Sequence, residues 1–330
     1  MIEISKNLKL ERATLATAQN FWNDSSEGSF FTNPDFLKKF NEQIDYWLVK
    51  KGNEQLCLWP ISINRKNFIT LPLFSYYFGP FWSDYLKKKT SQHSRFSLSM
   101  QVYELFFNNF EKKYKNIHFN FPPNNHDVRY FVWKKNFKNK SEISIYPKYS
   151  AIISNLNKKS MSEIYASFST LRRRMITKAK KEKNILKSNF FKLNEIIELY
   201  KSTISRKNKN AEKKDFKEGI NKIKFFFHIY ERDKTMISLN GFREKKTKRL
   251  ISLIMLGNGK YTSNLILNLS DKKYQTTGVT ALAMLDSIEQ AKREKMFNFD
   301  FNGSNSFIGS NDKHSYGSNY RLYFEIKSKT

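Results

Sequence analysis

The stretch QTTGVTALAMLDSIEQAKREKMFNFDFNGS, residues 275–304, decides which fold this chain is expected to adopt. It opens with a polar turn, continues as a helix to about residue 295, and ends in a strand from Met296 to Phe301. Three further strands are expected before it. These strands span residues 236–242, 250–256 and 262–269. Strands followed by a strand–helix–strand unit predict an α/β domain with a crossover helix.

The turn that opens this stretch is a candidate phosphate site. It consists of Gln275, Thr276, Thr277 and Gly278, directly before a helix whose first amides lack partners and carry partial positive charge. Glycine in such a turn allows a phosphate to approach the backbone closely. An ordinary helix start capped by threonine explains the same residues, so the turn alone leaves both interpretations open.

The strand that follows the helix carries polar side chains on one face. Alternation places Asn298, Asp300 and Asn302 opposite three phenylalanines. Strand ends beside a helix N-terminus are where open α/β sheets bind ligands. Asp300 is therefore a candidate general base, and the alternative is a structural carboxylate that holds the turn.

A basic helix is expected earlier in the second half of the chain. Ser160 and Glu163 have the spacing of a capping box. The helix also carries the triplet Arg172–Arg174, which spans ~200° of its surface and cannot face one ligand as a whole. One or two of these arginines bind phosphate, or all three form a solvated face. The apolar stripe expected on this helix consists of Ile164, Phe168, Leu171 and Met175.

The first half predicts a second mixed α/β domain. A short helix is expected after Asn33, a hairpin over 45–49 and 56–63, and a long helix through Phe110. A charged segment, 134–148, punctuated by Pro147, marks a boundary. We predict domains at 1–146 and 147–330.

These motifs resemble the two-domain Fem-like proteins of the GNAT superfamily, which has the acyl-CoA N-acyltransferase fold. Gln275-x-x-Gly278 is similar to the pyrophosphate loop of that superfamily, although Thr280 replaces its small last residue. Asp300 to Ser304 is similar to the Asp-Phe-x-Gly-Ser segment of Fem-like proteins. Segments 29–37 and 77–80 are similar to their N-terminal domain. The resemblance implies an α/β fold of tandem GNAT-like domains, each a mixed, mostly antiparallel sheet flanked by helices.

The resemblance also implies a site. Asp300 is expected to be catalytic together with Asn302, where many relatives have an acidic residue; an asparagine cannot act as a base, which leaves Asp300. The residues implied to bind the donor are Gln275, Thr276, Thr277, Gly278 and Arg173. The candidate acceptor-binding residues are Tyr76, Tyr77, Gly79 and Ser304, and the alternative for the two tyrosines is a role in packing.

The implied function is an N-acyltransferase that moves an acyl group from acyl-CoA to an amine of a sugar, a peptide or a cell-envelope precursor, without a metal. One alternative is an aminoacyl-tRNA-dependent transferase of the Fem type. Another is a non-enzymatic GNAT-like module that binds RNA or an acidic polymer.

Composition limits the remaining classes. The chain has 330 residues, 39% of them hydrophobic, which is ample for packed cores. The net charge of +29 indicates a polyanionic partner or reflects a lysine-rich composition. The single cysteine, Cys57, fits a reducing compartment. The N-terminus lacks the apolar segment of a signal peptide, and no stretch of ~20 apolar residues occurs, so a cytoplasmic protein without a membrane span is expected.

Overall fold

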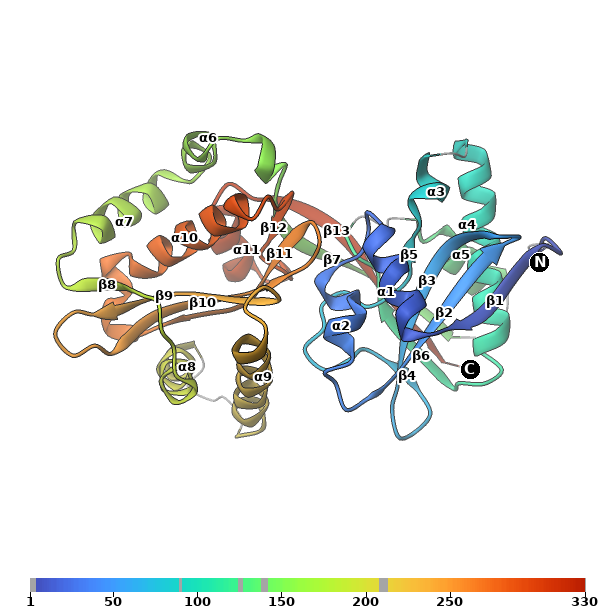
Figure 1. The fold of residues 1–330 in the computed structure, drawn as a ribbon, viewed down its shortest axis with the longest axis horizontal. Coiled ribbons are helices and arrows are strands. Elements are labelled where there is room, and N and C mark those ends of the chain that lie inside the picture. The colour runs from blue at the N-terminus through green and yellow to red at the C-terminus, as the bar shows by residue number, and fades with distance from the viewer. Residues whose placement is uncertain (1–3, 89–90, 124–126, 138–141, 208–212, 330) are drawn as a thin grey trace. The chain divides into compact units, whose positions relative to one another are not determined.

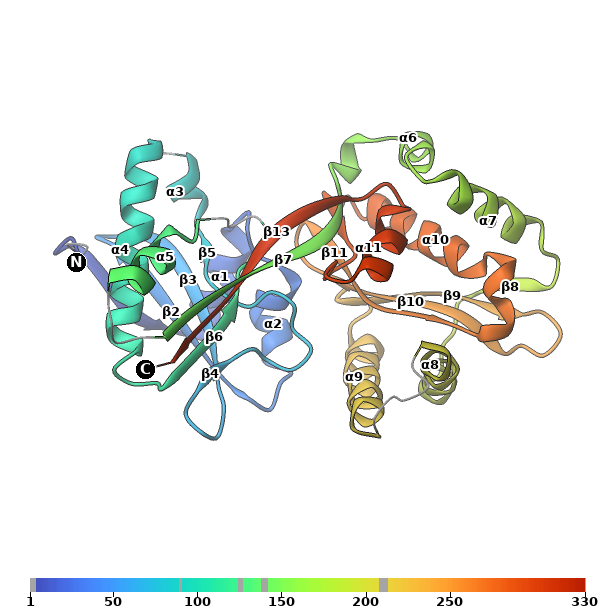
Figure 2. The same cartoon turned by 180° about the vertical axis from the view of Figure 1, so that it is seen from behind.

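The computed structural model describes residues 4–88, 91–123, 127–137, 142–207 and 213–329, and the chain forms two compact units. The first unit contains Met1–Ser150 and Arg321–Thr330, and the second contains Ala151–Tyr320. Each unit combines helices with a mostly antiparallel sheet, as predicted (Figures 1 and 2). The predicted second domain, 147–330, included the last ten residues, whereas these residues belong to the first unit. Positions 138–141 of the predicted boundary segment lie outside the described residues.

The first unit is an antiparallel sheet with helices on both faces. In Figures 1 and 2, α4 and α5 cover one face of β1–β3, and α1 and α2 lie on the other. The elements in chain order are β1 (Leu8–Ala13), α1 (Leu15–Asp24), a 3-10 turn (Phe30–Thr32), α2 (Pro34–Leu37), β2 (Gln43–Lys51), β3 (Glu54–Ile63), β4 (Ile69–Thr70), β5 (Phe81–Trp82), α3 (Asp84–Lys88), α4 (Gln92–Phe110), β6 (Asn116–Asn120), α5 (Arg129–Phe137), β7 (Glu142–Ser154) and β13 (Asn319–Lys329).

Local sequence explains the first elements of this unit. The Asn33 side chain accepts the Asp35 amide at 2.9 Å and so caps α2, with Pro34 at the first helical position. The β2–β3 hairpin turns at Gly52, whose φ of +58° suits glycine. Trp59 of β3 stacks on Phe106 of α4, with ring centroids 3.5 Å apart, and so joins sheet and helix in one core.

Strand pairing in the first unit follows the order β1-β2-β3-β4-β6-β13-β7, with β5 beside β3. The described pairs are antiparallel except for β4 and β6, which pair in parallel at Ile69 and Ile117. The helix α4 lies between these two parallel strands in the sequence. This strand–helix–strand unit is the feature that the second unit repeats.

The second unit is a three-layer arrangement of helices, sheet and helices. In both views α7 and α10 lie on one face of the sheet, and α8 and α9 lie on the other (Figures 1 and 2). The elements in chain order are the end of β7, a 3-10 turn (Leu156–Lys158), α6 (Met161–Ala166), α7 (Thr170–Lys181), β8 (Ile185–Ser188), α8 (Leu193–Lys207), α9 (Lys213–Arg232), β9 (Ile237–Glu244), β10 (Leu250–Asn258), β11 (Thr262–Ser270), the 3-10 segment η3 (Lys272–Thr277), α10 (Val279–Arg293), β12 (Asn298–Asp300) and α11 (Phe307–His314).

Pairing in the second unit follows the order β7-β12-β11-β10-β9-β8. β8 to β11 are antiparallel neighbours, β11 and β12 are parallel, and β12 is antiparallel to β7. The parallel pair is joined through α10. The predicted strand–helix–strand unit is therefore present.

The predicted basic helix is interrupted. Ser160 and Glu163 form the expected capping box at the start of α6, but α6 ends at Ala166 and Ser169 caps a separate helix, α7. The apolar stripe expected across both helices was therefore wrong at Leu171, which is 66% exposed. The phase of the pattern is lost where the chain leaves the helix between Ser167 and Ser169.

Candidate active site

The candidate site begins where β11 and β12 part. Their parallel ladder contains three residue pairs, from Thr262–Asn298 to Asn264–Asp300. β12 ends at Asp300, whereas β11 continues to Ser270. Past Asn264, the edge of β11 that faced β12 has no strand beside it in the described sheet. A ligand can therefore use main-chain groups there.

A β-bulge lies on β11 immediately past this point. Met255 of β10 pairs with Leu267, but the next residue, Leu256, pairs with Leu265. Ile266 is left between them as the extra residue. Bulges bend a strand and increase its twist, and they are frequent next to active sites. The bulge explains why β11 diverges from β12 here.

The turn after β12 is organised by Asp300 and Asn302. Asp300 is 2% exposed, and its Oδ1 accepts the Asn302 amide at 2.7 Å. This bond holds Asn302 at a φ of +53°, a left-handed conformation that asparagine tolerates. The side-chain amide of Asn302 donates to the Leu265 carbonyl at 2.7 Å. The two predicted catalytic residues are thus joined by a hydrogen bond, and the Asp300 carboxylate has at least a structural role.

Polar atoms without partners gather at the same turn. Asn302 Oδ1 and Ser304 Oγ are buried and have no hydrogen-bond partner among the described residues. The Lys313 ammonium donates to the main-chain carbonyls of Asn302 and Gly303, which fixes the backbone of the turn. Buried polar groups normally have partners, so Asn302 Oδ1 is suited to accept a hydrogen bond from a ligand, and Ser304 Oγ to accept or donate one. Lys313 was not predicted from the sequence, because α11 was missed.

The predicted phosphate turn begins the helix α10. Gln275 and Thr276 are exposed, Thr277 is half-buried, and Gly278 is buried. The Thr277 hydroxyl accepts the Val279 amide at 3.3 Å and donates to the Tyr274 carbonyl at 2.6 Å. The N-cap residue of α10 is Gly278, which has no side chain to cap the helix, so Thr277 bonds only the first helical amide. The remaining first-turn amides and the helix dipole still favour an anion at this end.

A close contact with α7 explains why position 278 is a glycine, and the sequence did not reveal this contact. Its φ is +80°, and a Cβ at this position would lie 2.1 Å from the main-chain oxygen of Met175 in α7. Glycine therefore allows α7 to cross the start of α10 at close range. The approach of a phosphate is not needed to explain this glycine.

The three arginines of α7 have different environments. Arg172 bonds Ser315 Oγ at 2.6 Å, forms an ion pair with Asp312, and lies over the Tyr316 ring at 4.8 Å. It therefore connects α7 to α11. Arg173 does not share these contacts with α11, and its buried Nε has no partner among the described groups.

Arg173 belongs to a shallow basic groove of about 630 Å³ along the outer face of α7. Residues at helical spacing of three and four bring cations and threonines onto one face. None of the described residues that line it is acidic. The lining residues are Tyr165, Thr170, Arg173, Arg174, Thr177, Lys178 and Lys181. Of these, only Arg173 was predicted as a site residue, although the spacing of the others was visible in the sequence.

The predicted acceptor residues of the first unit are mainly packing residues. Tyr77 is 1% exposed and meets Tyr323 edge-to-face at 5.1 Å. Tyr76 lies against Phe31 at 5.6 Å. A Cβ on Gly79 would lie 2.9 Å from the Asn120 oxygen, so the loop packs closely on β6. Acceptor binding by these residues stays a prediction.

Two general features concern the described residues alone. They include no group of three or more His, Cys, Asp or Glu side chains arranged to hold a metal. Their helices also include none with the length and apolar character that crossing a bilayer requires.

The fold matches solved structures over nearly the whole chain. FemX superposes with a TM-score of 0.65 at 11% identity, covering 96% of each chain. A conserved protein of unknown function from Bacteroides thetaiotaomicron gives 0.55 at 10% identity, covering 98% of this chain and 100% of that one. A tandem GNAT protein from the clavulanic acid biosynthesis pathway gives 0.53 at 7% identity, with 97% and 98% covered. No family model and no curated protein sequence matches this chain. The predicted tandem GNAT-like fold is confirmed.

Proposed function

We propose that this protein is an N-acyltransferase that moves an acyl group from acyl-CoA to an amine of a sugar, a peptide or a cell-envelope precursor. The observation that carries the proposal is the parting of β11 and β12 directly before the Asp300 turn. The parting leaves main-chain groups of β11 available beside a buried carboxylate and two orphan oxygens. The fold shared with FemX and the tandem GNAT protein supports the same class of reaction.

The acyl-CoA donor fits the groups around this parting. Main-chain amides of the Gly278 turn and the first turn of α10 that are not already bonded are suited to its pyrophosphate, because they lie at a helix N-terminus. Asn302 Oδ1 and Ser304 Oγ are suited to amide groups of its pantetheine arm. We assign Arg173, whose buried Nε has no partner among the described groups, to a phosphate of the donor.

The reaction moves one proton from the amine to the thiolate and polarises the acyl carbonyl. The acceptor nitrogen forms a bond to the acyl carbon, and the thioester C–S bond breaks. Asp300 accepts the proton lost by the amine, directly or through water, and the proton then passes to the CoA thiolate. Main-chain amides of β11 donate hydrogen bonds to the oxyanion that develops on the acyl oxygen.

A direct assay tests this proposal. Purified protein is incubated with acetyl-CoA or longer acyl-CoA and a panel of amino sugars, peptides and amino-sugar nucleotides. CoA release that depends on both substrates, with a product heavier by the acyl group, is expected. No transfer from any acyl-CoA would contradict the proposal.

An aminoacyl-tRNA donor is the second candidate, because the groove on α7 gathers four cations on one face. The same acceptors are offered with charged tRNA. Product from charged tRNA and none from acyl-CoA would replace the first proposal by the second. RNA binding without transfer from either donor would favour a non-enzymatic module.

A further inference from the structure

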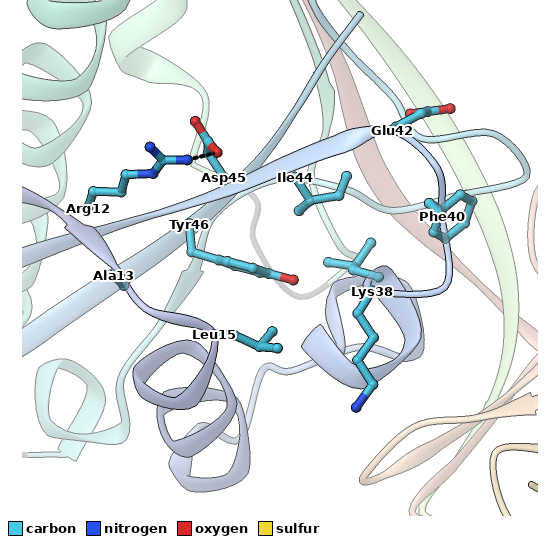
Figure 3. A pocket seen from close by; sticks show the side chains of 10 residues that line it. Arg12, Ala13, Leu15, Lys38, Phe40, Glu42, Ile44, Asp45 and Tyr46 are labelled. Atoms are coloured by element: carbon cyan, nitrogen blue, oxygen red, sulfur yellow. Dashed lines mark hydrogen bonds and ion pairs between the residues drawn. The ribbon is translucent and has the colours of Figure 1, made fainter.

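The first unit contains a pocket that the proposed transfer reaction does not use. It has a volume of about 380 Å³ and lies between the end of β1, the start of β2, and the helices α1 and α2 (Figure 3). This volume is within the range of small-molecule sites. Its apolar lining residues are Ala13, Leu15, Leu37, Phe40 and Ile44.

The hydroxyl of Tyr46 is the feature that marks this pocket as a site. Tyr46 is 6% exposed, and its Oη has no hydrogen-bond partner in the described chain. In Figure 3 its ring lies between Leu15 and Ile44, with the hydroxyl directed towards α2. A buried hydroxyl without a partner is costly to the folded state, so a group that bonds to it in a complex gains more than an exposed contact would.

The charged residues of the pocket already have partners. Arg12 pairs with the buried Asp45, and Lys38 pairs with Asp35 at 2.5 Å. Glu42 accepts the Ser62 hydroxyl at 2.6 Å. The ligand therefore need not carry a charge to satisfy them.

The electrostatic environment of the hydroxyl selects the type of ligand group. Burial, and then the negative charge of Asp35, raise the pKa of Tyr46, so the phenol keeps its proton and donates. The pocket is lined by two basic and two acidic residues that already have partners, so none is left to pair with a carboxylate or phosphate. A neutral carbonyl accepts the hydrogen bond without needing such a partner.

We propose that this pocket binds a neutral, amide-bearing ligand with an apolar side chain, whose carbonyl accepts a hydrogen bond from Tyr46. The apolar group packs on Leu15 and Phe40. N-acylated amines and apolar peptide segments have this chemistry. The proposal is independent of the transfer chemistry, because its residues belong to the first unit, whereas the proposed base, Asp300, belongs to the second.

The ligand reaches the hydroxyl past Leu15. Tyr46 Oη is covered when no ligand is present, and Leu15 lies beside it in Figure 3. Leu15 is 44% exposed at the first position of α1, so its side chain can change rotamer towards solvent. Such side-chain adjustments are common when a site is filled.

The test uses N-acetyl-L-leucinamide as the probe, titrated calorimetrically into the full chain. A ligand of this size is expected to bind with a dissociation constant of roughly 1 mM. Tyr46→Phe should weaken binding about three- to tenfold, the loss of one neutral hydrogen bond. Leu15→Trp should abolish binding by filling the pocket. N-acetyl-L-leucine, with a carboxylate in place of the C-terminal amide, should bind more weakly than the probe.

Tyr130→Phe is the matched control. Tyr130 is also buried in the first unit, but its hydroxyl bonds to Glu104 at 2.8 Å. This variant should lose thermal stability and bind the probe normally, whereas Tyr46→Phe should keep or raise its Tm. Absence of saturable binding to the unaltered protein at up to about 10 mM, a value near the weak limit for such ligands, would overturn the proposal. Unchanged binding in both Tyr46→Phe and Leu15→Trp, or tighter binding of the carboxylate, would overturn it as well.

Discussion

The side-chain amide of Asn302 donates a hydrogen bond of 2.7 Å to the main-chain carbonyl of Leu265. Leu265 is the first residue of β11 beyond its ladder with β12. The side chain of Asn302 thus takes the place of a strand partner where the two strands separate, and it links the turn after β12 to the edge of β11.

Replacing Asn302 with alanine should therefore loosen this link. The Leu265 carbonyl would lose its partner, and alanine would occupy a left-handed backbone conformation, so unfolding should become easier by about 1–3 kcal/mol. Urea denaturation measures the change. Asn298→Ala is the control, because Asn298 is half-buried and makes a longer bond, 3.3 Å, to Thr262. Equal losses in the two variants would contradict the role given to Asn302.

Two substitutions at Asp300 separate chemistry from structure. Asp300→Asn keeps an oxygen that can accept the Asn302 amide but removes the base, so turnover should fall about 10²–10⁴-fold with a small change in Tm. Asp300→Ala removes the base and also the oxygen that accepts the Asn302 amide, so it should lower turnover and Tm together. If Asp300→Asn retains full turnover, Asp300 is structural alone.

Gly278→Ala should destabilise the second unit strongly. The new Cβ would collide with the Met175 oxygen, and the positive φ adds backbone strain. Gly52→Ala is a matched control, since Gly52 has a φ of +58° and no atom near the position of a Cβ. Gly52→Ala should cost about 1 kcal/mol, and Gly278→Ala clearly more. Similar melting temperatures for the two variants would show that α7 does not cross Gly278 as described.

The basic groove on α7 makes a prediction about salt dependence. If its four cations bind RNA phosphates, replacing them with glutamine should reduce the slope of log affinity against log salt by about 3. The four substitutions are R173Q, R174Q, K178Q and K181Q. RNA binding is measured by fluorescence anisotropy across a salt series.

A charge-matched control decides whether position or total charge matters. Its four lysines are exposed and do not line the groove. The substitutions are K180Q, K183Q, K245Q and K246Q. Equal slopes for the two quadruple variants would show that the groove is not an RNA site and that net charge alone attracts RNA.

Much of the fold was predictable because its patterns are local. The β2–β3 hairpin and the order of three strands, helix and strand in the second unit were read from alternation and helical spacing, and all are present. Short elements held by tertiary contacts were missed. β8 is four residues long and is fixed by pairing with β9, and α11 begins with exposed Phe307 and Ile308, which give no amphipathic signal.

The local structure of the candidate site was predictable in part for the same reason. Asp300 and Asn302 were identified because alternation and the following glycine are features of one short segment. The contact of Asn302 with Leu265, and the contact of Gly278 with Met175, join residues far apart in the chain. Spacing in the sequence does not report such contacts, so the helix crossing at Gly278 was not predicted.

The position of β13 has a consequence for biosynthesis. β6 is hydrogen-bonded to β13, most of which follows the second unit in the chain, whereas the rest of the first unit precedes the second. Until β13 arrives, the nascent chain displays β6 as an open strand edge, which is a template for pairing with another chain. The ribosome must therefore synthesise the whole second unit before the sheet of the first unit is closed, and termination before β13 leaves a product prone to aggregate.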